Sequence, residues 1–353
     1  MTQEETNNPL RPSVSVVIPV YNVAPYVERC IWSVIKQTYP AKECIIVDDA
    51  STDDSITRCK RLIDGYKGAT HFVYLHHELN RGLAAARNTG TDAATGNYIF
   101  YLDSDDELTP DCLEKLSNQI RCDDSIEMVM GESKIDFSAM TGLKYRLKQW
   151  KSSSSTHFMR DTPSEMINNE EIRRWYYQGN TPRSFSVWNK LLKLSFVKEN
   201  HLYNKEGLKW EDTMWTYYLM RCINHVVIVH DVTYIYHIRP NSITVGAEKG
   251  EKDRHFGYIY REMAEHIVPG ERIEETVCWH KQFCRQYIEA WDNPNYQFAY
   301  GSFLRQLSEG KHQLAVWRLK AVHIMAQYRL GRIVYKSVMK AWILLQKIGR
   351  FIS

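Results

Sequence analysis

The sequence predicts an α/β protein in which a mostly parallel sheet is followed by a mostly helical C-terminal region. Apolar, β-branched runs such as Val14–Val20 alternate with helical patterns over the first 130 residues. Polar residues follow each run, and residues 250–353 show a helical pattern almost throughout. Strands that alternate with helices are typical of a parallel sheet, because parallel neighbours need crossover connections.

The expected elements follow a strand–helix rhythm that weakens after the fifth strand. Strands are predicted at 14–20, 44–47, 72–75, 98–102 and about 126–130, with helices at about 25–37, 55–64, 83–94 and from 111. Beyond them we expect a polar loop at 138–160, helices at 188–200 and 212–221, and a short hairpin formed by 226–229 and 232–236. The predicted domains are a flexible tail (1–12), an α/β domain (13–245, with halves 13–131 and 132–245) and a helical region (246–353).

The composition is that of a globular protein that works in a reducing compartment. Of the 353 residues, 44% are apolar and 25% are charged, and no apolar run reaches the roughly 18 residues of a membrane span. The N-terminal MTQEETNNPLRP lacks the basic start and apolar core of a signal peptide. Eight cysteines without a C-x-x-C pair favour reduced thiols. We therefore expect a cytoplasmic protein.

A D-S-D sequence follows the fourth predicted strand. Asp103 and Asp105 are two residues apart, so their carboxylates can point to the same side. Two adjacent carboxylates repel unless a proton or cation lies between them, and oxygen ligands favour Mg²⁺ or Mn²⁺. The functional interpretation is a metal that bridges a diphosphate, and the alternative is an Asp-rich turn that caps the next helix.

Polar groups also follow the other predicted strands, and in an open parallel sheet ligands bind beyond these carboxyl ends. Asp48 and Asp49 follow the second strand and could accept hydrogen bonds from a nucleobase or a ribose, or could simply form a turn. Arg87, near the start of a helix, could face phosphates or be solvated.

Taken together, these segments resemble glycosyltransferase family 2, whose members are inverting enzymes with the GT-A fold. The matching segments are VSVVIPVYN, SVIKQTYP, IIVDDASTD, NRGLAAARNTG, ATGNYIFYLDSDD and, later, WNKL and WEDT. The similarity is closest to bacterial enzymes that build capsule, lipopolysaccharide or teichoic-acid glycans. The order and spacing match over residues 14–110, and more loosely to about 245.

The resemblance implies roles for individual residues on the donor side. Pro19 and Tyr21 would line the nucleotide pocket, and Asp49, with Asp48 beside it, would hold the base, usually uracil. Asp103 and Asp105 would bind Mn²⁺ or Mg²⁺ together with the donor diphosphate. Ser104, which lies between them, would also contact the donor. The remaining implied residues are Asp212 as catalytic base, Glu211 to orient the acceptor or the base, and Trp188 and Lys190 on the acceptor side.

Each of these later residues also has a structural interpretation. Asp212 could be a helix N-cap, and Trp188 and Lys190 could be a core Trp and a solvated Lys. His237 and Arg239 follow the last predicted strand and could close on the diphosphate as a lid, or form a loop between domains.

The C-terminal tail is basic. Residues 310–353 contain nine Lys or Arg and no acidic residue, whereas residues 1–309 hold 36 basic and 42 acidic residues. On a helical wheel the basic residues of 311–353 oppose an apolar face, which suits an anionic membrane surface. The alternatives are a helix docked on the catalytic domain and, less favoured, nucleic-acid binding.

The sequence thus predicts an inverting, metal-dependent hexosyl- or N-acetylhexosaminyltransferase. It would move a sugar from a nucleotide-linked donor, UDP above all, to a hydroxyl of a glycan or lipid-linked acceptor in cell-surface polysaccharide synthesis. It would be peripheral on the inner face of the cell membrane. Rival hypotheses are a nucleotidyltransferase that makes nucleotide sugars, which should have a Gly-rich basic loop after the first strand, and a non-catalytic scaffold. The sugar, the acceptor, the linkage and the oligomeric state stay open.

Overall fold

The chain forms two compact units in a computed structural model. The structure describes residues 12–120, 123–139, 168, 170–172, 186–239, 249–267, 283–284, 286–328, 331–335 and 337–338. The first unit comprises residues 1–176 and 181–246, and the second comprises residues 177–180 and 247–353. The predicted loop at 138–160 lies almost entirely outside the described residues.

The first unit is built on an eight-stranded mixed sheet with the order β3-β2-β1-β4-β7-β6-β8-β5. β1, β2, β3 and β4 are parallel, and the antiparallel β7 joins β4 to β6. The first half of the sheet is therefore continuously parallel, whereas in the second half only β6 and β8 are parallel neighbours. The strands are β1 (Val14–Val20), β2 (Glu43–Asp48), β3 (His71–His76), β4 (Tyr98–Tyr101), β5 (Glu107–Leu108), β6 (Met128–Asp136), β7 (Lys190–Lys193) and β8 (Val226–His237).

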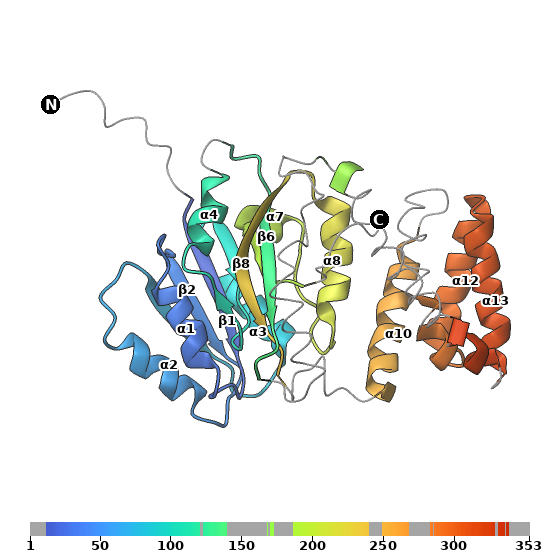
Figure 1. Cartoon of the computed structure of the whole chain (residues 1–353), viewed down its shortest axis with the longest axis horizontal. Coiled ribbons are helices and arrows are strands. Elements are labelled where there is room, and N and C mark those ends of the chain that lie inside the picture. Colours follow the sequence, from blue (N-terminus) through green and yellow to red (C-terminus); the bar gives the residue numbers. More distant parts are fainter. Residues whose placement is uncertain are drawn as a thin grey trace. The chain divides into compact units, whose positions relative to one another are not determined.

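Helices cover both faces of the parallel half, which explains why its central strands β1, β2 and β4 are buried along their whole length (Figure 1). The helices α1 (Val27–Ile35), α2 (Ser55–Ile63) and α4 (Cys112–Asn118) contribute to one continuous core with Val16 and Ile18 of β1. On the opposite face lies α3 (Leu83–Ala93), where Gly90 sits against Val17. A Cβ at Gly90 would lie 2.3 Å from Val17 Cγ1, so only glycine permits this close helix–strand approach.

Two predicted elements differ in the structure. The region 188–200, expected to be one helix, begins with strand β7 and continues as α7 (Leu194–Glu199). The short run Lys190–Lys193 is compatible with a helix or a strand by periodicity, and pairing with β4 and β6 favours the strand. The predicted hairpin at 226–236 is instead the single strand β8, which passes an irregularity opposite Gly131 and Glu132 without turning back.

The point where strand order reverses lies between β1 and β4, with β2 and β3 to one side of them. Pairing with β4 ends at Val17, so Pro19, which has no N–H to donate, is accommodated near the end of a central strand. From the far half of the chain α8 (Glu211–Cys222) begins with the Glu211-Asp212 pair, and both of these residues line the same cavity as Pro19.

The second unit is helical, with α10 (Lys249–Glu265), α12 (Pro294–Glu309) and α13 (Gln313–Gln327) packed in sequence. Its core is an aromatic cluster formed by Tyr260, Phe283, Tyr287, Tyr296 and Phe303. Within the described ranges, no helix is long and apolar enough to cross a membrane. The six cysteines that the structure describes are free thiols.

Candidate active site

A cavity of about 1140 Å³ lies over the carboxyl ends of β1 and β4. It is lined by most of the residues that the sequence singled out: Pro19, Tyr21, Asp49, Arg87, Asp103, Ser104, Asp105, Trp188, Glu211, Asp212 and Arg239. Among the described residues, Asp48, Lys190 and His237 do not line it. These residues come from segments up to 220 residues apart in the sequence (Pro19 to Arg239), so the sheet edge creates the site.

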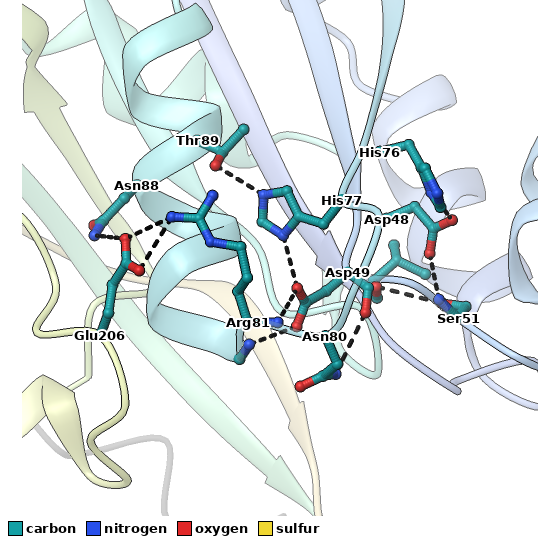
Figure 2. A network of polar contacts seen from close by, with 12 residues as sticks. Asp48, Asp49, Ser51, His76, His77, Asn80, Arg81, Asn88, Thr89 and Glu206 are labelled. Carbon is teal, nitrogen blue, oxygen red and sulfur yellow. Dashed lines mark hydrogen bonds and ion pairs between the residues drawn. The ribbon is translucent and has the colours of Figure 1, made fainter.

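The two carboxylates after β2 have different surroundings (Figure 2). Asp49 is 2% exposed, and it accepts hydrogen bonds from the backbone N–H groups of Arg81 (2.8 Å) and Gly82 (2.7 Å). Gly82 has φ +91°, a left-handed conformation that glycine adopts without steric cost. Asp48 instead accepts from Ser51 N at 2.8 Å and contacts His76 at 2.9 Å, so it closes a turn. The structure therefore brings only Asp49 to the cavity.

The D-S-D segment is held in place by arginines and by the buried carboxyl of Asp106. Asp103 Oδ1 lies 2.6 Å from Arg87, and one oxygen of Asp105 pairs with Arg239. Asp106 is fully buried and accepts from the Tyr234 hydroxyl and the His237 N–H, both at 2.8 Å. Burial, reinforced by the neighbouring carboxylates, raises the pKa of Asp106 well above its usual value.

Arg87 connects the two ends of the site. Its Nη1 lies 2.6 Å from Glu211 and its Nη2 lies 2.6 Å from Asp103, while the side chain is only 3% exposed. Burial alone would lower the pKa of Arg87, but the two carboxylates outweigh it and raise the pKa. Its guanidinium is thus already engaged by protein carboxylates, an arrangement that neither the phosphate-facing nor the solvated interpretation anticipated.

Asp212 is poised to exchange a proton near neutral pH. Burial is the main cause that raises its pKa to about 7, and the charge of Glu211 raises it further, whereas Arg87 opposes the shift. Trp210, directly before this pair, has a left-handed φ of +58°, which is uncommon for a residue with a side chain. Backbone strain of this kind is found most often at functional sites.

Trp188 lines the opposite side of the cavity, and Lys190 lies behind it. The ring of Trp188 stacks on Tyr234 and Tyr236, with centroid distances of 4.5 and 5.4 Å. Lys190 is buried, and its ammonium donates to the carbonyl of Ser186 at 2.6 Å, while burial lowers its pKa to about 7. Lys190 is therefore neither solvated nor in the cavity, because it braces the backbone behind Trp188.

The two residues predicted to form a lid are separated in the structure. His237 has both ring nitrogens engaged by carboxylates, with Asp136 at 2.8 Å and Glu107 at 2.9 Å. A ring held on both sides in this way has no nitrogen left for a diphosphate. Arg239, two residues later, lines the cavity, and its guanidinium lies over the ring of Tyr26 at 5.1 Å.

The carboxylates of the D-S-D segment fit a hard divalent cation. No cluster of three or more His, Cys, Asp or Glu residues with metal-binding geometry occurs in the described part of the chain. Each ion pair of Asp103 and Asp105 uses one carboxylate oxygen. Mg²⁺ in particular is commonly held by one or two carboxylates, with substrate phosphates and water completing its shell, so this oxygen pair suits a cation that arrives with a diphosphate.

Two residues that support this site, His77 and Asn189, were not predicted from the sequence. His77 follows β3 and contacts Asp49 at 2.7 Å, and Asn189 holds the carbonyls of Gly131 and Glu132. His77 could have been found by the rule that pointed to Asp49, since it too follows a parallel strand. No comparable signal marks Asn189.

The Arg87 bridge gives a prediction about stability. Arg87→Met should destabilise the fold by about 3–5 kcal/mol, because it leaves Glu211 as an uncompensated buried charge and removes the partner of the half-buried Asp103. The loss should shrink from pH 8 to pH 5, because burial raises the pKa of Glu211 and protonation at low pH can neutralise this carboxyl. Denaturant unfolding of the variant at both pH values measures it.

The matched control is Arg81→Met, which removes the exposed Arg81–Glu206 pair (both side chains 45% exposed) and should cost below about 1 kcal/mol. An Arg87→Met variant as stable as the Arg81→Met variant would show that the buried bridge contributes nothing.

Known glycosyltransferases are similar to this chain in sequence. The family described as Glycosyl transferase family 2 matches residues 15–183. The glycosyltransferase GlyG of Streptococcus pneumoniae is 30% identical over 231 residues, which cover 65% of this chain and 72% of GlyG. GlyA of the same organism is also 30% identical, over 65% of this chain, but the chain spans only 31% of the length of GlyA.

Two further similarities concern a pathway and the fold. A putative teichuronic acid biosynthesis glycosyltransferase of Bacillus subtilis, TuaG, is 43% identical over 108 residues, 30% of this chain and 40% of TuaG. The crystal structure of S. aureus TarS 1–349 in complex with UDP-GlcNAc superposes with a TM-score of 0.67 over 92% of both chains, at 18% identity. That likeness confirms the predicted GT-A fold. The family match and the relatives together show that this chain belongs to glycosyltransferase family 2.

Proposed function

We propose that the chain is an inverting glycosyltransferase that moves a hexosyl or N-acetylhexosaminyl group from a UDP-linked donor to a hydroxyl of a glycan or lipid-linked acceptor. The observation that carries this proposal is a cavity that is lined by the Asp103/Asp105 pair and by Asp212, whose pKa is raised to about 7. UDP-GlcNAc in TarS supports the choice of donor, and the teichuronic acid role of TuaG supports a place in cell-surface polysaccharide synthesis.

The acceptor is activated by Asp212 in the proposed reaction. The acceptor oxygen attacks the anomeric carbon opposite the diphosphate, so the new C–O bond forms while the bond to the diphosphate breaks. Asp212 takes the hydroxyl proton. A pKa near 7 suits this role, because the carboxylate is substantially ionised at neutral pH and still basic enough to accept a proton.

The other residues hold the two substrates around this step. Asp49, Pro19 and Tyr21 are proposed to hold the nucleotide, while Ser104 and Arg239 are placed to contact the diphosphate. Asp103 and Asp105 would hold Mn²⁺ or Mg²⁺, which when bound offsets the negative charge that develops on the leaving diphosphate.

Charged and aromatic side chains surround the proposed acceptor side of the cavity. Burial raises the pKa of Glu211, and Arg87, 2.6 Å away, opposes this shift by favouring the ionised form. The charge of Glu211 in turn raises the pKa of Asp212. Trp188, braced from behind by Lys190, is proposed to support the acceptor.

A donor screen tests the proposal. The full chain is incubated with UDP-, GDP-, ADP- and dTDP-sugars and Mn²⁺, and the released product is identified. Release of nucleoside diphosphate from a UDP-sugar is the expected result. Pyrophosphate formation from sugar 1-phosphate and nucleoside triphosphate would show a nucleotidyltransferase, and a chain that turns over no donor in the presence of acceptor extracts would be a scaffold.

The basic C-terminal region is proposed to bind an anionic membrane surface at the cytoplasmic face. In α13, Leu319 and Val322 are buried in the helical unit, whereas Leu314, Trp317 and Ile324 are 71%, 68% and 60% exposed. An exposed apolar stripe beside basic side chains suits the lipid interface. Residues 339–353 of the predicted amphipathic tail lie outside the described residues.

This proposal predicts salt-dependent binding to vesicles. The full chain should sediment with vesicles of phosphatidylglycerol and phosphatidylcholine, and not with phosphatidylcholine alone. Lys311→Glu should weaken binding at least about fivefold, because one basic residue near such a surface contributes about 1 kcal/mol. Trp317→Ser should remove the part of the binding that survives high salt.

Lys67→Glu is the matched control, since it makes the same charge change at an exposed position of the first unit. Equal loss in both charge variants would mean that net charge alone drives adsorption. Binding that is indifferent to lipid charge would contradict the proposal.

A further inference from the structure

The carboxylate of Asp49 is oriented by three protein donors, one of which is a histidine side chain. Arg81 N and Gly82 N are backbone donors, and His77 Nδ1 lies 2.7 Å from Asp49 Oδ1 (Figure 2). Both side chains are almost fully buried, with 6% exposure for His77 and 3% for Asp49. This pair therefore interacts in a site from which water is largely excluded, where a hydrogen bond to a charged group is strong.

The ring of His77 is fixed at both nitrogens. A carboxylate only accepts hydrogen bonds, so Nδ1 carries the hydrogen that faces Asp49. In the neutral ring Nε2 is then the acceptor, and it lies 2.9 Å from the hydroxyl of Thr89 on α3. His77 thus ties Asp49 to α3, the helix that also carries Arg87.

The three donors leave part of Asp49 available to a ligand. Oδ1 accepts from both His77 and Arg81 N, whereas Oδ2 accepts only from Gly82 N among the described donors. A carboxylate oxygen accepts about two hydrogen bonds, so Oδ2 keeps one lone pair for a donor in the cavity that Asp49 lines. Because His77 and Arg81 N both occupy Oδ1, Oδ2 is the oxygen that stays available to a ligand.

We propose that His77 is a positioning residue that orients Asp49 toward the nucleobase of the donor and so sets nucleotide affinity and selectivity. The inference rests on the proposed function, in which Asp49 contacts the nucleobase. His77 itself does not line the cavity and would not touch the ligand.

The neighbouring histidine provides a matched control. His76 contacts Asp48 at 2.9 Å, but its side chain is 63% exposed and neither residue lines the cavity. His76→Leu and His77→Leu therefore remove the same chemical group one residue apart, with only the second change acting on Asp49.

Calorimetric titration of the full chain with UDP and with GDP, in the presence of Mn²⁺, tests the inference. His77→Leu should weaken UDP binding about 10- to 100-fold, the loss expected for one hydrogen bond to a charged group. The preference for UDP, measured as the ratio of the affinities for UDP and GDP, should also decrease. His77→Asn should stay within about threefold of wild type, because the amide nitrogen of Asn can take the place of Nδ1. Donor hydrolysis by His77→Leu should show a raised KM with kcat little changed.

Three results would overturn the inference. His77→Leu could bind UDP like wild type while its thermal unfolding shows an intact fold. His77→Asn could lose as much affinity as His77→Leu, which would assign the effect to ring packing. A wild-type chain that binds neither nucleotide would overturn the proposed donor site first, and with it the role of His77.

Discussion

Asp212→Asn should lower the turnover number about 10²–10⁴-fold and leave nucleotide binding nearly unchanged. The amide has the shape of the carboxyl but cannot take the proton of the acceptor hydroxyl, and loss of a general base costs roughly this factor. The donor side of the cavity is built from the loops after β1, β2 and β4 and not from α8. Steady-state kinetics with a saturating donor, together with calorimetric titration of UDP, measures both quantities.

The matched control is Asp231→Asn, which makes the same substitution on β8 at a side chain that is 57% exposed and pairs with Lys115. It should change neither quantity. Parallel loss of nucleotide affinity and turnover in Asp212→Asn would place Asp212 in the donor site or in the fold, and the catalytic assignment would be wrong.

The raised pKa of Asp212 adds two pH effects with a defined sign. The kcat/KM of wild type should rise with pH to a plateau, with a midpoint of about 7, because the base must be unprotonated. In the folded protein this carboxyl keeps its proton up to about pH 7, whereas in the unfolded chain it loses the proton near pH 4. Folding stability therefore falls as pH rises between these values and stays low above them. Asp212→Asn removes this penalty, so its thermal stability should exceed that of wild type at pH 8 and match it near pH 4.

The sequence was sufficient to predict which residues form the proposed donor half of the cavity, because their positions follow from a rule about strand ends. Asp49 and the D-S-D segment each follow a buried strand, and parallel strands place their carboxyl ends at one edge. The position of each loop along the chain therefore indicated its position in space.

The contacts between these residues could not be predicted in the same way. Arg87 meets Asp103, 16 residues away, and Glu211, 124 residues away, and no periodic pattern encodes a contact at such separations. His237 illustrates the same limit, since its two carboxylate partners lie on β5 and β6, which pair with β8 in register only after folding. The sequence identified the chemical groups, and tertiary packing determined their partners.

Secondary structure was mispredicted where tertiary pairing outweighs local pattern. The short run Lys190–Lys193 fits a helix or a strand by periodicity, and it is a strand because it fills the gap between β4 and β6. The polar His230-Asp231 step suggested a turn, yet β8 continues through it with an irregular register opposite β6.

Removal of divalent cations should abolish turnover, and Mn²⁺ or Mg²⁺ should restore it. Charge neutralisation of the leaving diphosphate is worth several kcal/mol, so its loss should cost about 10²–10⁴ in rate at 1.36 kcal/mol per tenfold. Asp105→Asn should show the same deficit with Mn²⁺ present, because one of only two carboxylates of the D-S-D segment is then neutral. Turnover after treatment with EDTA, and its recovery on titration with MnCl₂, measures the effect in wild type and variant.

The decisive measurement is the affinity for UDP, which can be determined without turnover. Its expected dependence on Mn²⁺ follows from the ion pairs of the ligand-free site. Without a cation, Arg87 balances the negative charge of Asp103 and Arg239 balances that of Asp105. Both carboxylates therefore have a cationic partner in the ligand-free site. UDP binding in EDTA should then be weak, and Mn²⁺ should strengthen it in wild type but not in Asp105→Asn. Asp111→Asn, an exposed carboxylate that pairs with Lys115 nearby in the sequence, should keep the full dependence on Mn²⁺. UDP affinity that ignores Mn²⁺ in wild type, together with full turnover in chelator, would show that Arg87 and Arg239 neutralise the diphosphate and that the D-S-D carboxylates only hold these arginines in place.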